Sequence, residues 1–390
     1  MLPQDWGSAV LLGRMDFGEG PSPVLVIQGQ VFDISEHAST VAEFLSRYDR
    51  NSLPEGTSRG PLSALDLRAQ WACDAEQAPV RLLAPIDLQC IKACGVTFAV
   101  SAIERVIEER AGGDSSRARD IRAALVERVG ADLKSVKPGS YEARRLKAVL
   151  IADGLWSQYL EVAIGPDAEV FTKAPILSAV GSGAYVGVRS DSAWNNPEPE
   201  IVIVCDAEGC PRGAALGNDV NLRDFEGRSA LLLGKAKDNN ASAAIGPFIR
   251  LFDASFTMDS VRDAVVQLEV EGRDGFRLAG ESSMRLISRD PLELIAQTVS
   301  RHHQYPDGLV VFLGTMFAPT DDRGEPGQGF THRPGDRVRV STPRLGLLDN
   351  EVCACEDAPQ WTFGVSALMK NLAARGLLGT GERQQTRARA

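Results

Sequence analysis

Three acidic residues carry the clearest chemical signal in this 390-residue chain. Glu198 and Glu200 are separated by one residue and lead into the apolar run 201–204, so an extended backbone would direct both side chains to the same side. Asp219 follows in a glycine-containing segment that reads as a turn after a strand. Hard carboxylate oxygens suit Mg²⁺, Mn²⁺ or Ca²⁺, and these groups would repel one another if they were buried without a cation. The same residues also fit a solvated acidic loop, and this alternative stays open here.

Two lysines, Lys235 and Lys237, lie in a segment rich in small residues, GKAKDNNAS over 234–242, which leads to a Gly-Pro pair. Beside a divalent cation, a lysine of this segment could lose its proton and act as a base, or stay charged and neutralise an enolate. A surface lysine is the plain alternative, although the Gly-Pro ending favours a tightly shaped loop. Asn240 of the same segment could bind hydroxyl groups of a polyol through its amide, or it could form a turn.

Other metal chemistry is disfavoured. The seven cysteines form no CxxC pair and are odd in number, which indicates reduced structural thiols rather than a disulfide framework. None of the four histidines lies at metal-ligand spacing with a cysteine, so a zinc centre of the usual nitrogen and sulfur kind is not expected. Any metal in this chain should therefore have oxygen ligands.

Charge and composition restrict the partners. The chain has 42 Lys+Arg against 52 Asp+Glu, a formal net charge of -10, so it lacks the basic footprint of a protein that grips nucleic acid. No window approaches 18 uninterrupted apolar residues, and the first 14 residues lack the basic start and apolar core of a signal peptide. We expect a soluble, cytoplasmic protein with a small-molecule partner, no nucleic acid and no membrane.

The elements that must position these residues form an α+β pattern. Apolar runs broken by Gly-Pro predict a hairpin or meander over 9–35, followed by helical periodicity over 41–48, 101–110, 117–129 and 142–155. Beyond residue 170 short β-type runs dominate, at 184–188, 201–205, 265–270, 276–278, 309–314 and 337–341. An Asp-Pro start predicts one helix over 292–302 between the strands. This order disfavours a doubly wound sheet.

These pieces resemble the fumarylacetoacetate hydrolase family. The family has an ExE pair, then an NDVxxRD segment, then a lysine ten residues before the proline of a Gly-Pro pair. Glu198 and Glu200, the segment NDVNLRD over 218–224, and Lys237 before Pro247 fit this order. Gly314-Thr315 and the RPGD segment over 333–336 fit the family's C-terminal signature, and together the matches span roughly residues 85 to 352.

The resemblance implies a β-roll catalytic domain that holds Mg²⁺ through Glu198, Glu200 and Asp219. The ion would chelate the carboxylate and the 2-keto oxygen of a 2-oxo acid, which stabilises the enolate formed when a proton leaves C3. Lys237 would assist or accept that proton. By the same resemblance, Thr315 closes on the substrate carboxylate, and Lys173, in a KxP element, is either structural or part of the substrate pocket.

The chain departs from the hydrolases of this family at one position. They carry GLNYxxHxxE, whose His and Glu activate water for carbon–carbon cleavage, whereas this chain has GVTFAVSAIE over 95–104, with Ser101 in place of the histidine and Glu104 retained. Serine cannot accept a proton from water near neutral pH as imidazole can. An enolate-forming site without that base suits loss of a C4 hydroxyl, with Glu104 protonating the departing hydroxide.

This combination is similar to the sugar-acid dehydratase branch of the family, whose members act on 2-keto-3-deoxy pentonates to give 2,5-dioxopentanoate in oxidative pentose catabolism. The similarity extends to GVTFAVSxxERVIEE, AKDNNAS and the N-terminal LLGRMDFGEGPSPVLV. It implies a metal-dependent hydro-lyase that is a homodimer or homotetramer. We divide the chain into a mixed N-terminal domain over 1–85, a catalytic domain over 86–375 that includes the helical segment 101–160, and a disordered tail over 376–390.

Two other functions remain open. The first is an acylpyruvate or 2,4-diketo acid hydrolase, which would need another group in place of the missing histidine. The retained Glu104 keeps this alternative open. A non-catalytic binder of 2-oxo acids, or an oligomer with a structural metal, belongs to a different class. Helical spacing also gives the run from Glu104 to Arg110 a plain interpretation as a solvated helix face.

Overall fold

The computed structural model describes residues 1–72, 80–122, 136–315, 317, 319, 321–323 and 329–378. Its centre is an eleven-stranded mixed sheet, in which, among the described strands, only β16 and β6 pair in parallel. The strand order is β4 (Thr57–Pro61), β3 (Gln30–Asp33), β2 (Pro21–Ile27), β1 (Val10–Asp16), β13 (Ala243–Leu251), β11 (Pro211–Asp219), β10 (Pro199–Cys205), β16 (Leu309–Phe312), β6 (Cys90–Gly95) and β7 (Glu169–Ala174), with β5 (Arg81–Leu82) paired to β1.

A second sheet of five strands packs against the first. Its order is β15 (Arg277–Ser283), β14 (Val265–Glu271), β17 (Arg337–Thr342), β18 (Gly346–Ala354) and β8 (Tyr185–Val188). Alternating residues of β10, such as Ile201 and Ile203, share a hydrophobic cluster with Leu268 and Val340 of the second sheet, whereas Val202 and Val204 face a different cluster. Strand β10 is therefore buried on both faces, which explains its unbroken apolar sequence. A two-stranded ribbon joins β9 (Asn195–Asn196) to β12 (Asn221–Leu222).

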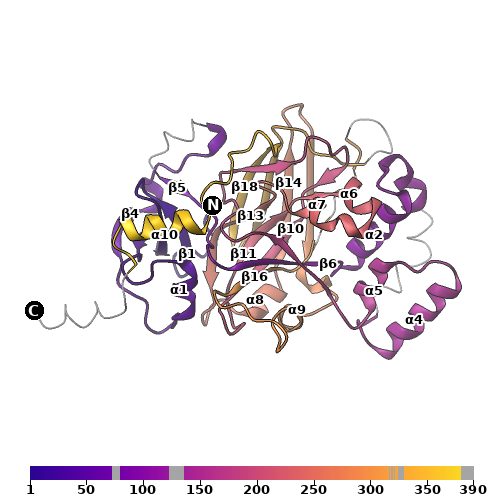
Figure 1. Ribbon diagram of the computed structural model, residues 1–390, viewed down its shortest axis with the longest axis horizontal. Coiled ribbons are helices and arrows are strands. Elements are labelled where there is room, and N and C mark those ends of the chain that lie inside the picture. Colours follow the sequence, from indigo (N-terminus) through magenta and orange to yellow (C-terminus); the bar gives the residue numbers. More distant parts are fainter. Residues whose placement is uncertain are drawn as a thin grey trace, which may run out of the picture.

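Helices lie mainly around the sheets (Figure 1). Helices α2, α4, α5, α6 and α7 gather on one side of the molecule, and α1 and α10 on the other. The helices are α1 (Val41–Ser46), α2 (Ala99–Ala111), α4 (Tyr141–Ala152), α5 (Gln158–Ile164), α6 (Arg223–Arg228), α7 (Leu233–Lys237), α8 (Met258–Arg262), α9 (Pro291–Thr298) and α10 (Val365–Ala374), with 3-10 turns at Leu62–Ala64, Gln70–Ala72, Ala230–Leu232 and Met284–Leu286. Among the described residues, no helix is long and apolar enough to cross a membrane.

The predicted α+β fold is confirmed, and the strands and helices lie close to the expected positions. Helices α1, α4 and α9 end before the predicted positions. Helix α9 ends at Thr298, because Val299 is extended and Ser300 forms a bridge with His303. The histidine pair 302–303 therefore lies beyond the helix. The helix expected over 117–129 runs into residues 123–135, which lie outside the described part, as do residues 379–390 of the expected tail.

The first strands continue the central sheet. Strand β1 pairs with β13 through Leu11 with Arg250 and Leu12 with Ile249. The C-terminal helix α10 returns to the same region, where the Asn371 amide donates a hydrogen bond to the Glu19 carbonyl oxygen. The proposed division of the chain at residue 85 thus falls between strands that share one sheet, and it stays a prediction.

Candidate active site

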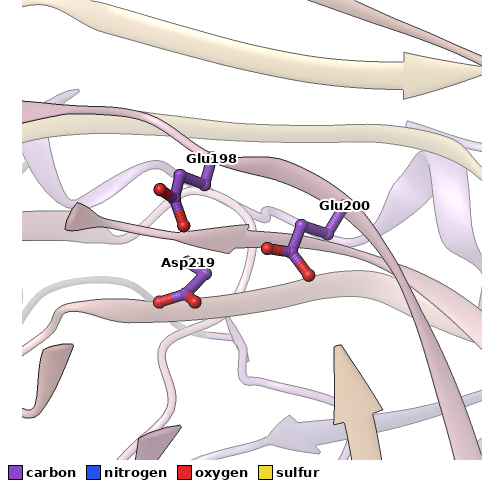
Figure 2. Close-up of side chains that lie close together, drawn as sticks. All are labelled: Glu198, Glu200 and Asp219. Carbon is purple, nitrogen blue, oxygen red and sulfur yellow. The ribbon is translucent and has the colours of Figure 1, made fainter. Parts of the chain in front are cut away.

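The three predicted carboxylates come together where β10 and β11 pair. Glu198 directly precedes β10, Glu200 lies within it, and Asp219 is the last residue of β11, whose antiparallel register sets Glu200 opposite Gly217. The three carboxylates lie close together (Figure 2), and each offers an oxygen within 4.8 Å of an oxygen of the other two. Each residue is at most 3% exposed. The interpretation of these residues as a solvated loop is therefore wrong.

Cationic side chains surround this cluster. The Lys237 ammonium lies 2.5 Å from Glu198 Oε2 and 3.1 Å from Asp219 Oδ2. Lys173 Nζ lies 2.8 Å from Asp219 Oδ1 and donates a hydrogen bond to the Lys237 carbonyl oxygen. Arg105 of α2 pairs with the other Glu198 oxygen. Both oxygens of Glu198 thus have cationic partners, while the Glu200 carboxylate accepts a hydrogen bond from the Gly314 amide at 2.7 Å.

Burial and mutual repulsion govern the protonation of the cluster. Desolvation, together with the nearby Asp219 and Glu198 charges, raises the pKa of Glu200 well above its ordinary value. Burial acts to lower the pKa of Lys237, but attraction by Asp219 and Glu198 outweighs it, and the pKa of this ammonium is raised. Buried carboxylates that repel one another are the environment that a hard divalent cation relieves. The donor set therefore fits Mg²⁺, Mn²⁺ or Ca²⁺.

A small cavity of about 10 Å³ lies beside the cluster. Five predicted residues line it: Lys237, Ser101, Thr315, Glu198 and Asp219. The other lining residues are Cys94, Gly95, Val96, Arg105, Glu169, Phe171 and Glu226. Two basic side chains thus face four acidic ones across this space, an excess of negative charge that also favours a bound cation.

The first part of α2 has a different role from the one expected. The Ser101 hydroxyl accepts a hydrogen bond from the Phe98 amide and donates one to the Phe98 carbonyl oxygen, so it is occupied at the N-terminus of the helix. Glu104 accepts two hydrogen bonds from Arg122, at 2.9 and 2.6 Å, and it does not line the cavity. Both predicted side chains are buried but have protein partners.

The predicted substrate-binding residues are spread more widely. Thr315 lines the cavity, and its hydroxyl donates to the Phe317 carbonyl oxygen at 2.9 Å. Lys173 is fully buried behind Asp219, where burial lowers the pKa of its ammonium despite the Asp219 charge. Asn240 lines a separate surface pocket, and its amide donates to the carbonyl oxygens of Cys355 and Pro359. Of these three, the structure therefore brings only Thr315 to the cavity.

The sequence analysis missed three polar residues of the cavity: Arg105, Glu169 and Glu226. The interpretation of the run from Glu104 as a solvated face is wrong, because Arg105 and Glu108 are at most 7% exposed. A signal was present: residues 101, 104, 105 and 108 have i, i+3, i+4 and i+7 spacing, so they share one helix face. Glu169 gives no such local signal, since only the pairing of β7 with β6 brings it to the site.

Glu169 is distinguished by its pKa. Desolvation, followed by repulsion from Glu226, raises the pKa of Glu169 from 4.5 to about 7. A carboxyl group with this pKa is protonated in a large fraction of molecules near neutral pH, which suits a general acid.

Known proteins resemble this chain in sequence. Residues 164–353 match the family described as fumarylacetoacetate (FAA) hydrolase, C-terminal. A probable 2-keto-3-deoxyxylonate dehydratase of Haloferax volcanii is 28% identical over 62% of this chain and 88% of its own length. A 2-dehydro-3-deoxy-D-arabinonate dehydratase of Saccharolobus solfataricus is 35% identical over 46% of this chain, and the match spans 57% of that relative. Dehydratase is the enzyme class that the sequence predicts.

Solved structures show the same fold. A 2-keto-3-deoxy-D-arabinonate dehydratase complexed with magnesium and 2,5-dioxopentanoate superposes with a TM-score of 0.61 at 20% identity, covering 88% of this chain and 99% of that one. A fumarylacetoacetate hydrolase from Exiguobacterium antarcticum gives a TM-score of 0.52 at 18% identity, covering 89% of this chain and 100% of that one. The predicted resemblance to the fumarylacetoacetate hydrolase family is confirmed over residues 164–353, where the family model matches this chain.

Proposed function

We propose that this protein is a metal-dependent hydro-lyase that converts a 2-keto-3-deoxy pentonate to 2,5-dioxopentanoate. The observation that carries the proposal is the buried triad of Glu198, Glu200 and Asp219 beside a cavity that holds an acid with a pKa of about 7. The two curated relatives are named as dehydratases of such acids, and one solved neighbour is complexed with magnesium and 2,5-dioxopentanoate.

The triad would hold the metal, with Mg²⁺ as the proposed ion and Mn²⁺ or Ca²⁺ as alternatives. A divalent ion there supplies a Lewis acid for the carboxylate and 2-keto oxygens of the substrate. Thr315 at the cavity wall is placed to receive the substrate carboxylate. Lys173 is proposed to act indirectly, because its ammonium fixes both the Asp219 carboxylate and the backbone of Lys237.

Two side chains are proposed to transfer protons. Lys237 is proposed to accept the C3 proton, which requires that Glu198 and Asp219 first gain another partner, since these carboxylates now hold the lysine proton. Glu169 would donate its proton to the C4 hydroxyl, which leaves as water. We assign this acid to Glu169 rather than to Glu104, because Arg122 holds both Glu104 oxygens. The elimination leaves a double bond between C3 and C4. Loss of a proton from C5 and return of a proton to C3 move this bond to C4 and C5, and tautomerisation of that enol gives the C5 aldehyde.

The test is to incubate the purified protein with Mg²⁺ and racemic 2-keto-3-deoxypentonate, and separately with an acylpyruvate. Mass spectrometry then follows 2,5-dioxopentanoate and pyruvate. We expect dioxopentanoate, loss of its formation with a chelator, and no turnover by a folded Glu200→Gln variant. Pyruvate released from the acylpyruvate alone would instead identify a hydrolase. Retention of substrate with both compounds would favour a binding protein.

We also propose that the protein is a homodimer or homotetramer. Sedimentation velocity on the full chain measures this directly, and a monomer at micromolar concentration would contradict it.

A further inference from the structure

The cavity contains one acceptor that the proposed reaction does not use. Glu226 of α6 is 3% exposed and lines the cavity. Its Oε2 lies 3.0 Å from Arg105 Nη1, yet it accepts no hydrogen bond among the described residues. A buried carboxylate oxygen without a hydrogen bond is costly, so this oxygen marks a place where a donor from a ligand would be favourable.

The hydroxyl and ammonium groups around the cavity already have hydrogen-bond or ion-pair partners. The Ser101 and Thr315 hydroxyls donate to backbone carbonyl oxygens, and Lys237 is paired with the metal-site carboxylates. Phe171 forms an apolar part of the wall. With Glu169 assigned to the C4 hydroxyl, Glu226 is the described side chain that remains for a further hydroxyl group.

Neighbouring elements hold Glu226 in place. The Tyr159 hydroxyl of α5 donates to the Glu226 carbonyl oxygen at 3.3 Å, and Arg105 of α2 approaches its carboxylate. Arg105 also pairs with Glu198, so the same guanidinium links Glu226 to the metal site. A preorganised acceptor at a fixed position relative to the metal is suited to selecting substrates by chain length and hydroxylation.

We propose that Glu226, positioned by Arg105, binds the terminal C5 hydroxyl of the substrate and so selects a hydroxylated five-carbon chain over a deoxygenated one. The inference rests on the proposed function, because it takes the substrate to be a 2-oxo sugar acid. It predicts that the site distinguishes two 2-oxo acids that differ only in this hydroxyl, by about tenfold or more in affinity.

The test uses ligands that lack the C4 hydroxyl and so cannot be dehydrated: 5-hydroxy-2-oxopentanoate and 2-oxopentanoate. Isothermal titration calorimetry with Mg²⁺ measures both dissociation constants for the wild type and for Glu226→Met. The variant should bind 5-hydroxy-2-oxopentanoate about tenfold more weakly and 2-oxopentanoate within twofold of the wild type. Each ligand loses the same hydration in every titration, so a difference in its dissociation constant between variants comes from the protein.

Glu108 provides the matched control. It also pairs with Arg105 Nη1, at 2.6 Å, but it does not line the cavity. Glu108→Met should therefore change the affinity for both ligands by the same factor. If Glu226→Met, like Glu108→Met, changed the affinity for both ligands by the same factor, the proposal would be wrong and Glu226 would be only a structural partner of Arg105.

A milder variant keeps the test decisive if Glu226→Met does not fold. Glu226→Gln keeps an acceptor oxygen, so it should retain most of the preference for the hydroxylated ligand, and loss of affinity for both ligands equally would contradict the assignment. These measurements need no turnover. A protein that shows the hydroxyl preference but does not dehydrate the pentonate would refute the proposed reaction while leaving the Glu226 assignment intact.

Discussion

At the scale of single residues, the acid of the site can be tested through Glu169. Replacing it with Gln removes the proton donor at nearly the same volume, so kcat should fall by about 10²- to 10⁴-fold. In the wild type, kcat should decline as pH rises through about 7, because the protonated form is lost there. A pH–rate profile of both proteins checks this, and an unchanged alkaline limb in Glu169→Gln would assign the acid elsewhere.

The same residue should affect stability in a pH-dependent way. Its pKa in the folded protein is raised above the ordinary 4.5, so folding favours the protonated form, and this contribution is complete below pH 4.5 and lost as pH rises through about 7. Metal-free Glu169→Gln should therefore exceed the wild type in melting temperature at pH 8, with the difference vanishing near pH 4.5. Thermal unfolding in chelator at both pH values measures it. A constant difference would contradict the burial of an acid here.

Only some residues of the candidate active site could be predicted from the sequence. Glu198 and Glu200 could be predicted because their spacing on an extended segment places two carboxylates on one side, whereas Lys237 was selected through the family's spacing between a lysine and a Gly-Pro pair. Glu169 and Glu226 belong to separate segments, and only the pairing of β7 with β6 and the packing of α6 on α2 bring them together. Ser101 lines the cavity, but its hydroxyl caps α2, a role that the family motif does not predict.

At the scale of elements, the connection after β16 positions both the metal site and Thr315. Gly314 has a φ of +98°, which disfavours other residues, and a Cβ there would lie 2.0 Å from Thr97 Oγ1. Its amide also donates to Glu200. Gly314→Ala should shift this connection, weaken Mg²⁺ binding by about tenfold and reduce the free energy of unfolding by about 1–3 kcal/mol.

The control is Gly364→Ala at the start of α10, where φ is −92° and no atom lies within 4 Å of the added carbon. Calorimetric titration with Mg²⁺ and thermal unfolding compare the two variants. If Gly314→Ala bound Mg²⁺ as tightly as Gly364→Ala, the connection after β16 would have no part in shaping the metal site.

At the scale of the whole molecule, the central sheet couples segments that lie far apart in sequence. Periodicity predicted most of its strands and the absence of a doubly wound order, since apolar alternation is a local property. It did not predict that β1 pairs with β13, because strand partners depend on contacts between distant segments. Two observations show how closely these strands are joined: Leu12 of β1 is fully buried, and the Asp5 carboxylate pairs with the buried guanidinium of Arg250 in β13.

This pairing sets the last prediction, which concerns the division of the chain at residue 85. A fragment of residues 86–378 would expose the edge of β13 and leave Arg250, which is 0% exposed, without the Asp5 carboxylate. Unpaired edges and uncompensated buried charges promote aggregation and cost several kcal/mol. We therefore expect this fragment to be insoluble or to unfold without cooperativity, and coexpression with residues 1–85 to restore a soluble complex. A fragment that is soluble alone, binds Mg²⁺ and unfolds in one sharp transition would instead establish residues 86–378 as an independent catalytic domain, with the first strands as a separate module.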